Sequence, residues 1–300
     1  MKYIRILLFI FSGLFFAGAS YAWITGGFLV SPMGIRISMT RPNYPFAYGL
    51  GMMMIGVGLS KNWRLSGSVS ARLVRLSFWE RLVLFLIPIA LLQALFYLLP
   101  NNEFWNLDSE GDVGTFYSAV ALFFAGLIVY DIFRLEKGMG ATRREAWLPI
   151  LFLFWGLSID ELVSAHNATV HFLRQLGLFG EISQHSERYE QWPWVIFLSP
   201  FAIAVIFYMK RFFTDRFHHC RRSFILSGIG LVVWINAYLF EIMVATSFPR
   251  KLQGGIEEGS ELLGTTLFGL AFLEFFAYTA RSYPKLEASE EDAVRKPLRF

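Results

Sequence analysis

The sequence predicts an all-α membrane protein: a bundle of about eight transmembrane helices with a small extracytoplasmic hairpin after the first helix. Hydrophobic residues make up 55% of the 300 residues and charged residues only 17%, whereas about a quarter of a soluble domain is charged. The apolar residues form blocks of about 17–22, the length that crosses a hydrocarbon core about 30 Å thick. Lys and Arg concentrate in alternate connections, as cytoplasmic loops require.

The predicted transmembrane domain covers residues 1–280. Its helices are expected at about residues 6–22, 45–59, 82–99, 115–133, 147–166, 192–208, 224–245 and 261–280. The first helix follows a short basic start and ends near Ser20-Tyr21-Ala22, which resembles a signal-peptide cleavage site. An uncleaved first helix gives eight spans with both termini inside, and cleavage would leave seven.

Residues 26–41 differ from the apolar blocks around them. Phe28-Leu29-Val30 is followed by Ser31-Pro32-Met33-Gly34, and the next residues alternate between apolar and polar. Pro at the second position and Gly at the fourth suit a type I turn, and the alternation is typical of a strand. The pattern predicts a small hairpin on the outer face, with an irregular interfacial loop as the alternative.

The charges of the connections give the orientation. The connection 61–81 carries five basic residues and one glutamate, whereas residues 101–114 hold four acidic residues and no Lys or Arg. The positive-inside rule places the first in the cytoplasm and the second outside. Residues 281–300 form a short, charged cytoplasmic tail. The net charge of +4 follows from this asymmetry, so we expect the lipid bilayer as partner and no nucleic acid.

A set of acidic and histidine side chains is predicted to share one depth near the outer boundary. Asp160 and Glu161 come three and four residues after the apolar run 147–157, and a charge at the centre of such a helix costs about 2.5–3.5 kcal/mol on insertion scales. Three helices contribute to this set, whose candidate ligands are Asp160, Glu161, His166, His171, Glu241, Glu257, Glu258 and Glu261. An intramembrane carboxylate is a functional-site hypothesis by default.

Helical spacing separates these side chains further. Asp160 shares one face with Ser164 and His171, whereas Glu161 points elsewhere. Glu257 and Glu261 are four residues apart and share a face if the last helix is already wound at Glu257.

Three interpretations remain open. The cluster could bind a divalent metal that activates water, although no HExxH motif is present. It could instead hold protons or cations in a transporter. It could also be a structural network, in which the glutamates lie at the positive N-terminal end of the last helix.

The stretch Ser158-Ile159-Asp160-Glu161-Leu162-Val163-Ser164-Ala165-His166-Asn167 resembles an S-x-D-E-x-x-x-x-H-E pattern of a group of uncharacterised bacterial multipass inner-membrane proteins. Residues 256–264 resemble the same group's E-E-x-x-E-x-x-G pattern, and Glu241 matches a single buried acid there. Asn167 stands where the group has Glu. The resemblance covers the C-terminal half and implies a bacterial inner membrane, but no biochemical activity.

Together these observations predict an extracytoplasmic Asp/Glu/His pocket that binds a divalent metal or protons and acts on a lipid-linked or small periplasmic substrate. The alternative is a non-enzymatic transporter or a membrane assembly partner. The sequence leaves enzyme activity undecided.

Overall fold

The computed structural model describes residues 2–25, 28–30, 37–39, 43–59, 69–98, 113–164, 169, 172, 175–176, 192–242 and 250–295. Long helices dominate these residues. Their bounds are α1 (Lys2–Thr25), α2 (Asn43–Gly58), α4 (Phe78–Leu98), α5 (Val113–Gly138), α6 (Trp147–Val163), α8 (Trp192–Phe217), α9 (Arg221–Ile242) and α10 (Arg250–Arg295). A short helix, α3 (Val69–Leu73), precedes α4, and a 3-10 turn, η4 (Arg144–Ala146), precedes α6.

Each long helix overlaps one predicted segment, but fewer of them qualify as membrane spans. Within the described residues, six helices are long and apolar enough to cross a bilayer, which fits an integral membrane protein. The six are α1, α4, α5, α6, α9 and α10. The predicted count of eight spans is therefore not confirmed. The helix α2 has only 16 residues, and the side chains of the first turns of α8 lie outside the description.

Two short strands follow α1. β1 (Phe28–Val30) pairs antiparallel with β2 (Ile37–Met39), and Leu29 lies opposite Ser38. The predicted turn at residues 31–34 lies outside the described residues, and the location of the pair on the outer face stays a prediction.

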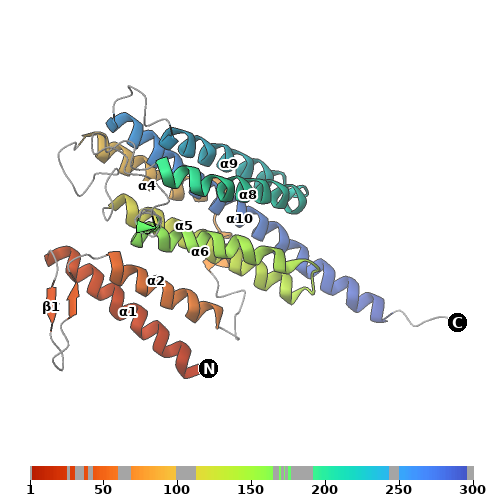
Figure 1. The fold of residues 1–300 in the computed structure, drawn as a ribbon. Helices are drawn as coiled ribbons and strands as arrows, with labels where there is room; N and C mark the ends of the chain where they lie inside the picture. Colours follow the sequence, from red (N-terminus) through yellow and green to blue (C-terminus); the bar gives the residue numbers. More distant parts are fainter. Residues whose placement is uncertain are drawn as a thin grey trace.

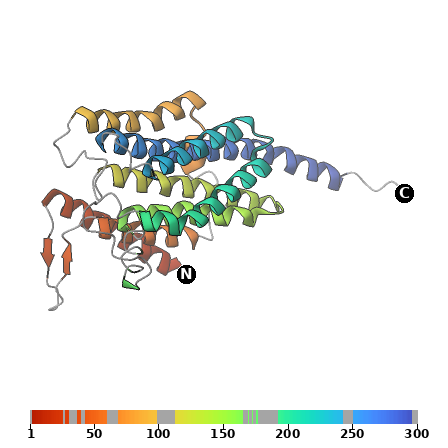
Figure 2. The same ribbon diagram turned by 45° about the horizontal axis from the view of Figure 1, so that its top comes forward.

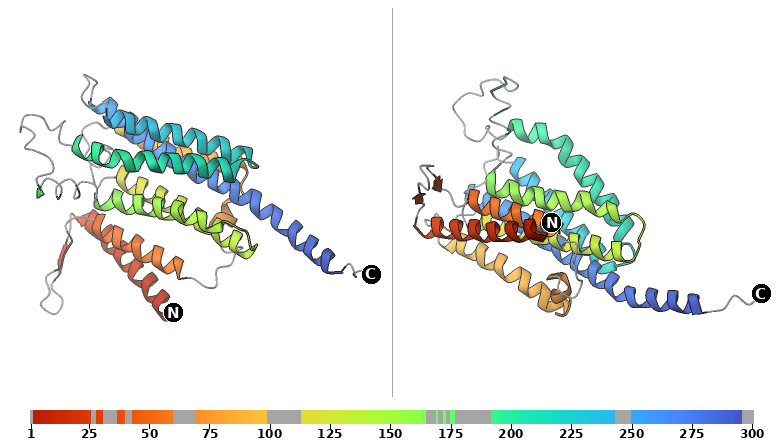
Figure 3. Two further views of the ribbon diagram at one scale, coloured as in Figure 1. Left: turned by 45° about the vertical axis from the view of Figure 1, so that its right-hand side comes forward. Right: turned by 90° about the horizontal axis from the view of Figure 1, so that it is seen from below.

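The helices run back and forth between two ends of the molecule (Figures 1 and 2). We call the end beside β1 and β2 the strand end, and the opposite end, where α1 begins and α10 leaves the bundle, the terminal end. The helices α4, α6 and α9 run toward the strand end, and α5, α8 and α10 run away from it (Figure 3). The start of α1 and the end of α10 therefore lie on the same side of the bundle (Figure 1).

The C-terminal helix is the centre of the bundle. α10 packs along α9 and also contacts α5 and α4, while α6 packs against α5. Trp147 of α6 has its ring against Phe212 of α8 and Phe275 of α10, and its side chain is completely buried. The helices α1 and α2 form a separate pair that joins the rest chiefly where α2 packs on α6. Aromatic packing thus fixes α6, α8 and α10 relative to one another.

The course of α10 differs from the prediction at both ends. The expected helix 261–280 begins at Arg250 and continues to Arg295, so residues 281–295 of the predicted tail are helical. Gly255 and Gly259 lie in this added part of the helix and let α4 approach closely. A Cβ on Gly255 would overlap the Tyr97 hydroxyl, and one on Gly259 would lie 2.6 Å from Nε2 of Gln93. These glycines, which by themselves disfavour a helix, therefore serve helix contact, as small residues do in membranes.

Candidate functional site

The structure describes five of the eight predicted site side chains. These five are all half-buried, and they come from the last turns of α6 and from α10: Asp160, Glu161, Glu257, Glu258 and Glu261. His166 and His171 lie outside the described residues, as does the side chain of Glu241, whose backbone belongs to α9. Because α6 ends and α10 begins at the strand end (Figure 1), the five carboxylates lie at that end of the bundle.

An aromatic contact connects α6 to α9 and α10 below these carboxylates. The Phe154 ring of α6 lies 5.7 Å from the Phe268 ring of α10 and stacks on Trp234 of α9 at 5.7 Å. The Trp234 indole N–H donates to the carbonyl oxygen of Glu261 at 3.2 Å. The face of α6 that carries Phe154 therefore looks toward α10.

Helix geometry places two of the carboxylates on the same helix faces as this aromatic contact. Glu161 follows Phe154 by seven residues, and Glu261 precedes Phe268 by seven residues. Seven residues are almost two turns, about 10.5 Å along the axis, and return to nearly the same face. Because α6 and α10 run in opposite directions, both displacements lead toward the strand end. Glu161 and Glu261 are thus on the facing sides of their helices at a common level.

Asp160 belongs to a different side of α6. It follows Phe154 by six residues, which places it about 120° away from that ring around the helix axis. It continues the line of Leu153 and Leu157, which are both half-buried. This separation agrees with the expectation that Asp160 and Glu161 do not aim at one centre of a regular helix.

The helical start of α10 weakens one explanation of its glutamates. A helix dipole favours carboxylates within the first turn only. Because α10 begins at Arg250, no acidic residue lies in its first turn, and Glu257, Glu258 and Glu261 follow Arg250 by seven to eleven residues. The dipole interpretation is therefore wrong for these residues. Their spacing within one continuous helix also satisfies the condition for Glu257 and Glu261 to share a face.

Polar residues that the sequence analysis did not include lie at the same end. The buried Nε2 of Gln93 on α4 has no hydrogen-bond partner among the described residues, and it lies against Gly259. The Asn236 amide of α9 donates to the Ser260 hydroxyl at 3.4 Å. A lone amide in an apolar helix could have marked Gln93, since burying an amide is costly without a partner.

The metal hypothesis remains a prediction. Among the side chains that the structure describes, no three of His, Cys, Asp and Glu gather closely enough to hold a metal ion. Three predicted ligands lie outside that description. The described geometry can bring together two carboxylates, which suffices to share a proton or to contribute two of the ligands of a cation.

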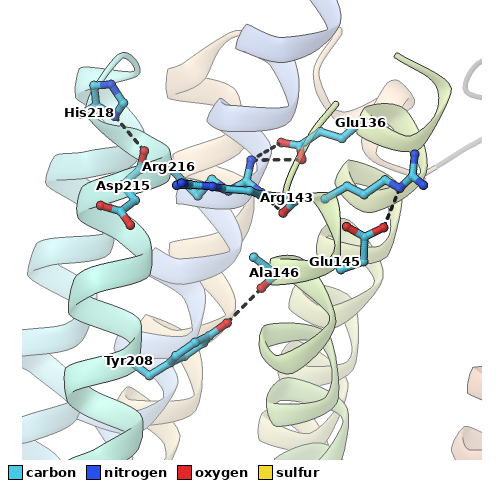
Figure 4. A network of polar contacts seen from close by, with 9 residues as sticks. Glu136, Arg143, Glu145, Ala146, Tyr208, Asp215, Arg216 and His218 are labelled. Carbon is cyan, nitrogen blue, oxygen red and sulfur yellow. Dashed lines mark hydrogen bonds and ion pairs between the residues drawn. The ribbon is translucent and has the colours of Figure 1, made fainter. Parts of the chain in front are cut away.

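The terminal end carries a second polar network, shown in Figure 4. Arg216 of α8 reaches Glu136 at the end of α5, with Nη1 3.3 Å from Oε2, and its Nη2 donates to the Arg143 carbonyl oxygen. Arg143 has a left-handed backbone with φ 65°, and its carbonyl oxygen is held by that guanidinium. The guanidinium also lies over the Trp147 ring, 5.8 Å from its centroid. Arg216 therefore joins α5, the α5–α6 connection and α8.

Buried charges at the terminal end are paired across helices. Arg81 Nη2 of α4 lies 2.6 Å from Glu274 Oε1 of α10, as an ion pair rather than an aligned hydrogen bond, and both side chains are at least 91% buried. The Ser70 hydroxyl of α3 donates to Asp131 at 2.6 Å. Arg81 was predicted at the end of the connection 61–81, whereas the structure places it inside α4. These contacts stabilise the bundle and include none of the predicted site residues.

Comparison with protein families identifies one relationship. A family model described as "Domain of unknown function (DUF8692)" matches residues 71–275, more than half of the chain. The chain belongs to the DUF8692 family. The DUF8692 region begins in α3 and ends in α10, so it contains all eight predicted site residues and leaves out α1, β1, β2 and α2. Comparisons with curated proteins and with solved structures find no match.

Proposed function

We propose that this DUF8692 protein is a multipass protein of the bacterial inner membrane that binds a cation at the strand end, which lies on the extracytoplasmic side. The cation is a divalent metal or a proton, and Glu161 and Glu261 are the central pair. The observation that carries the proposal is the Phe154–Phe268 contact, which turns the faces bearing the two glutamates toward each other. Glu257 and Glu258, four and three residues before Glu261 on α10, and His166, His171 and Glu241 are the further candidate ligands.

The charge distribution supports this orientation. The described parts of the terminal end, residues 69–81 and 134–146 and the start of α9, carry nine Lys and Arg, whereas residues 101–114 between α4 and α5 hold none. The positive-inside rule then assigns the terminal end and both termini to the cytoplasm. A site at the strand end would meet a lipid-linked or small periplasmic substrate. The same site would serve a transporter if no chemistry occurs there.

Half-burial of the carboxylates makes cation binding physically reasonable. Two ionised carboxylates on facing helices repel, and low-dielectric surroundings strengthen that repulsion. A bound metal or a shared proton removes the repulsion. The competing explanation, a purely structural network, has lost the helix-dipole contribution because α10 begins at Arg250.

The test is a metal measurement on purified protein in detergent. Wild type, Glu161→Gln and Glu261→Gln are dialysed against zinc or manganese, and bound metal is counted by mass spectrometry. Glu145→Gln is the matched control, because Glu145 is an exposed carboxylate at the other end. We expect both site variants to lose bound metal and the control to keep it.

If the two glutamates share a proton instead of binding a metal, the stability of the protein should depend on pH. Metal-free wild type should then become less stable than Glu261→Gln as the pH rises, because only the wild type gains the repulsion between two ionised carboxylates. Thermal unfolding followed across pH measures this difference. Equal metal content and parallel pH dependence in wild type and in both variants would refute the proposal.

A further inference from the structure

Arg222 occupies an unusual position at the terminal end, where α9 begins close to the start of α4. Its guanidinium lies over the Phe78 ring of α4, 5.2 Å from the centroid. Its Nη1 lies 3.7 Å from Glu274 Oε2, yet 67% of the side chain is exposed. The arginine is therefore held in place while most of its five N–H donors still face outward.

The local charge around this guanidinium is positive. Glu274 already has Arg81 at 2.6 Å, so one buried carboxylate faces two arginines. Arg221 precedes Arg222 and is also exposed. The other carboxylates near these helix starts in the sequence are the exposed Asp215 at the end of α8 and Glu80 of α4, which accepts the backbone N–H of Ser77 at 2.6 Å. The surface thus offers positively charged donors rather than a closed set of ion pairs.

Exposed apolar side chains lead toward the strand end from Trp79 along α4 and from Arg222 along α9. On each helix they are between 44% and 66% exposed: Phe224, Ile225, Ile229 and Val232 on α9, and Val83, Leu84 and Ile87 on α4. Trp79, next to Phe78, is 70% exposed, and Trp is enriched at the depth of lipid headgroups. The two faces have the pattern of an amphiphile's binding surface, apolar along its length and cationic at one end.

We propose that Arg221, Arg222 and Trp79 bind the phosphate headgroup of an anionic phospholipid in the leaflet at the terminal end. The acyl chains lie along the exposed faces of α4 and α9. The planar guanidinium suits phosphate because it donates two parallel hydrogen bonds. A free phosphate ion would use the arginines alone, so the apolar faces and Trp79 favour a lipid. The inference requires only that α4 and α9 span a membrane and is independent of the cation site.

The experiment titrates purified protein in a neutral detergent with phosphatidylglycerol and counts bound lipid by native mass spectrometry. The test variant is the double substitution Arg221→Gln and Arg222→Gln. Its matched control is Lys210→Gln with Arg211→Gln, an adjacent and exposed basic pair of α8 near the same end. Each arginine that contacts the headgroup should contribute about fivefold, the effect of one basic residue near an anionic lipid surface. The test variant should therefore bind roughly 25-fold more weakly, and the control, whose residues do not contact the headgroup, within about twofold.

Two further measurements test whether the site prefers an anionic lipid over a neutral one, and whether it binds the whole lipid or only a phosphate ion. Phosphatidylcholine should bind the wild type at least tenfold more weakly, and inorganic phosphate at the same concentration should not displace phosphatidylglycerol. Equal weakening in both double variants, equal binding of the two lipids, or displacement by phosphate would each overturn the proposal. If the double variant does not fold, Arg221→Gln alone should still weaken binding about fivefold, and unchanged binding would overturn it.

Discussion

Removal of the Arg81 side chain should strongly destabilise the bundle. Arg81 and Glu274 join α4 to α10, with 4% and 9% of their side chains exposed. In Arg81→Ala the Glu274 carboxylate stays buried without its close partner. Breaking a buried ion pair in this way costs about 3–5 kcal/mol.

The remaining arginine compensates for little of this loss. Arg222 lies 3.7 Å from Glu274 and is mostly exposed, and such a pair contributes about 1 kcal/mol at most. The expected decrease in the free energy of unfolding is therefore about 2–4 kcal/mol. At roughly 3 °C per kcal/mol for a chain of this size, the unfolding midpoint should fall by about 6–12 °C. Replacing both partners by apolar residues, Arg81→Met with Glu274→Leu, should return it close to the wild-type value.

Thermal unfolding of the detergent-solubilised protein measures these differences. Arg144→Ala is the control, because it breaks an exposed pair in which 33% of Arg144 and 63% of Glu145 are accessible, and its midpoint should change by no more than about 3 °C. If Arg81→Ala changes the midpoint no more than Arg144→Ala, the pair is not buried between α4 and α10. If the apolar double variant is as unstable as Arg81→Ala, the loss comes from packing and not from an uncompensated charge.

Two more predictions concern helix packing and orientation. Gly264→Ala should destabilise the α9–α10 contact by about 1–3 kcal/mol, because its Cβ would overlap the Trp234 ring and lie 3.2 Å from the Gly230 carbonyl oxygen. Gly269→Ala, whose Cβ would meet nothing within 4 Å, should be neutral or stabilising in the same unfolding assay, and equal losses would contradict the close crossing. A phosphatase fused within residues 101–112 should be active outside the cytoplasm, and a fluorescent protein fused after residue 300 should fluoresce inside. The reverse pattern would show that the orientation is wrong.

The sequence located the helices because lipid allows few alternatives. A backbone that crosses a bilayer must satisfy its own hydrogen bonds, so a long apolar block is helical. Each of the long helices accordingly overlaps a predicted block. The polar start of α10 was harder to predict, since Gly254, Gly255 and Gly259 are typical of a connection. Only the contact with α4 shows that they lie in a helix.

The candidate site was also only partly predictable from the sequence. Asp160, Glu161 and the glutamates near Glu257 stand out in the sequence because charges are rare in apolar helices. The facing of Glu161 and Glu261 comes from the Phe154–Phe268 contact, which connects residues more than one hundred positions apart.

By itself, the sequence determined the class of the protein, the approximate places of its helices and the positions of its acidic residues along them, because the order of the residues alone sets the hydrophobicity along the chain. The tertiary structure decided the rotation of each helix about its axis. A helix that is apolar on all sides gives no pattern by which its buried face can be told from its lipid face. Only packing against neighbours places Arg81 inside the bundle, leaves Arg222 on its surface and turns Glu161 toward α10.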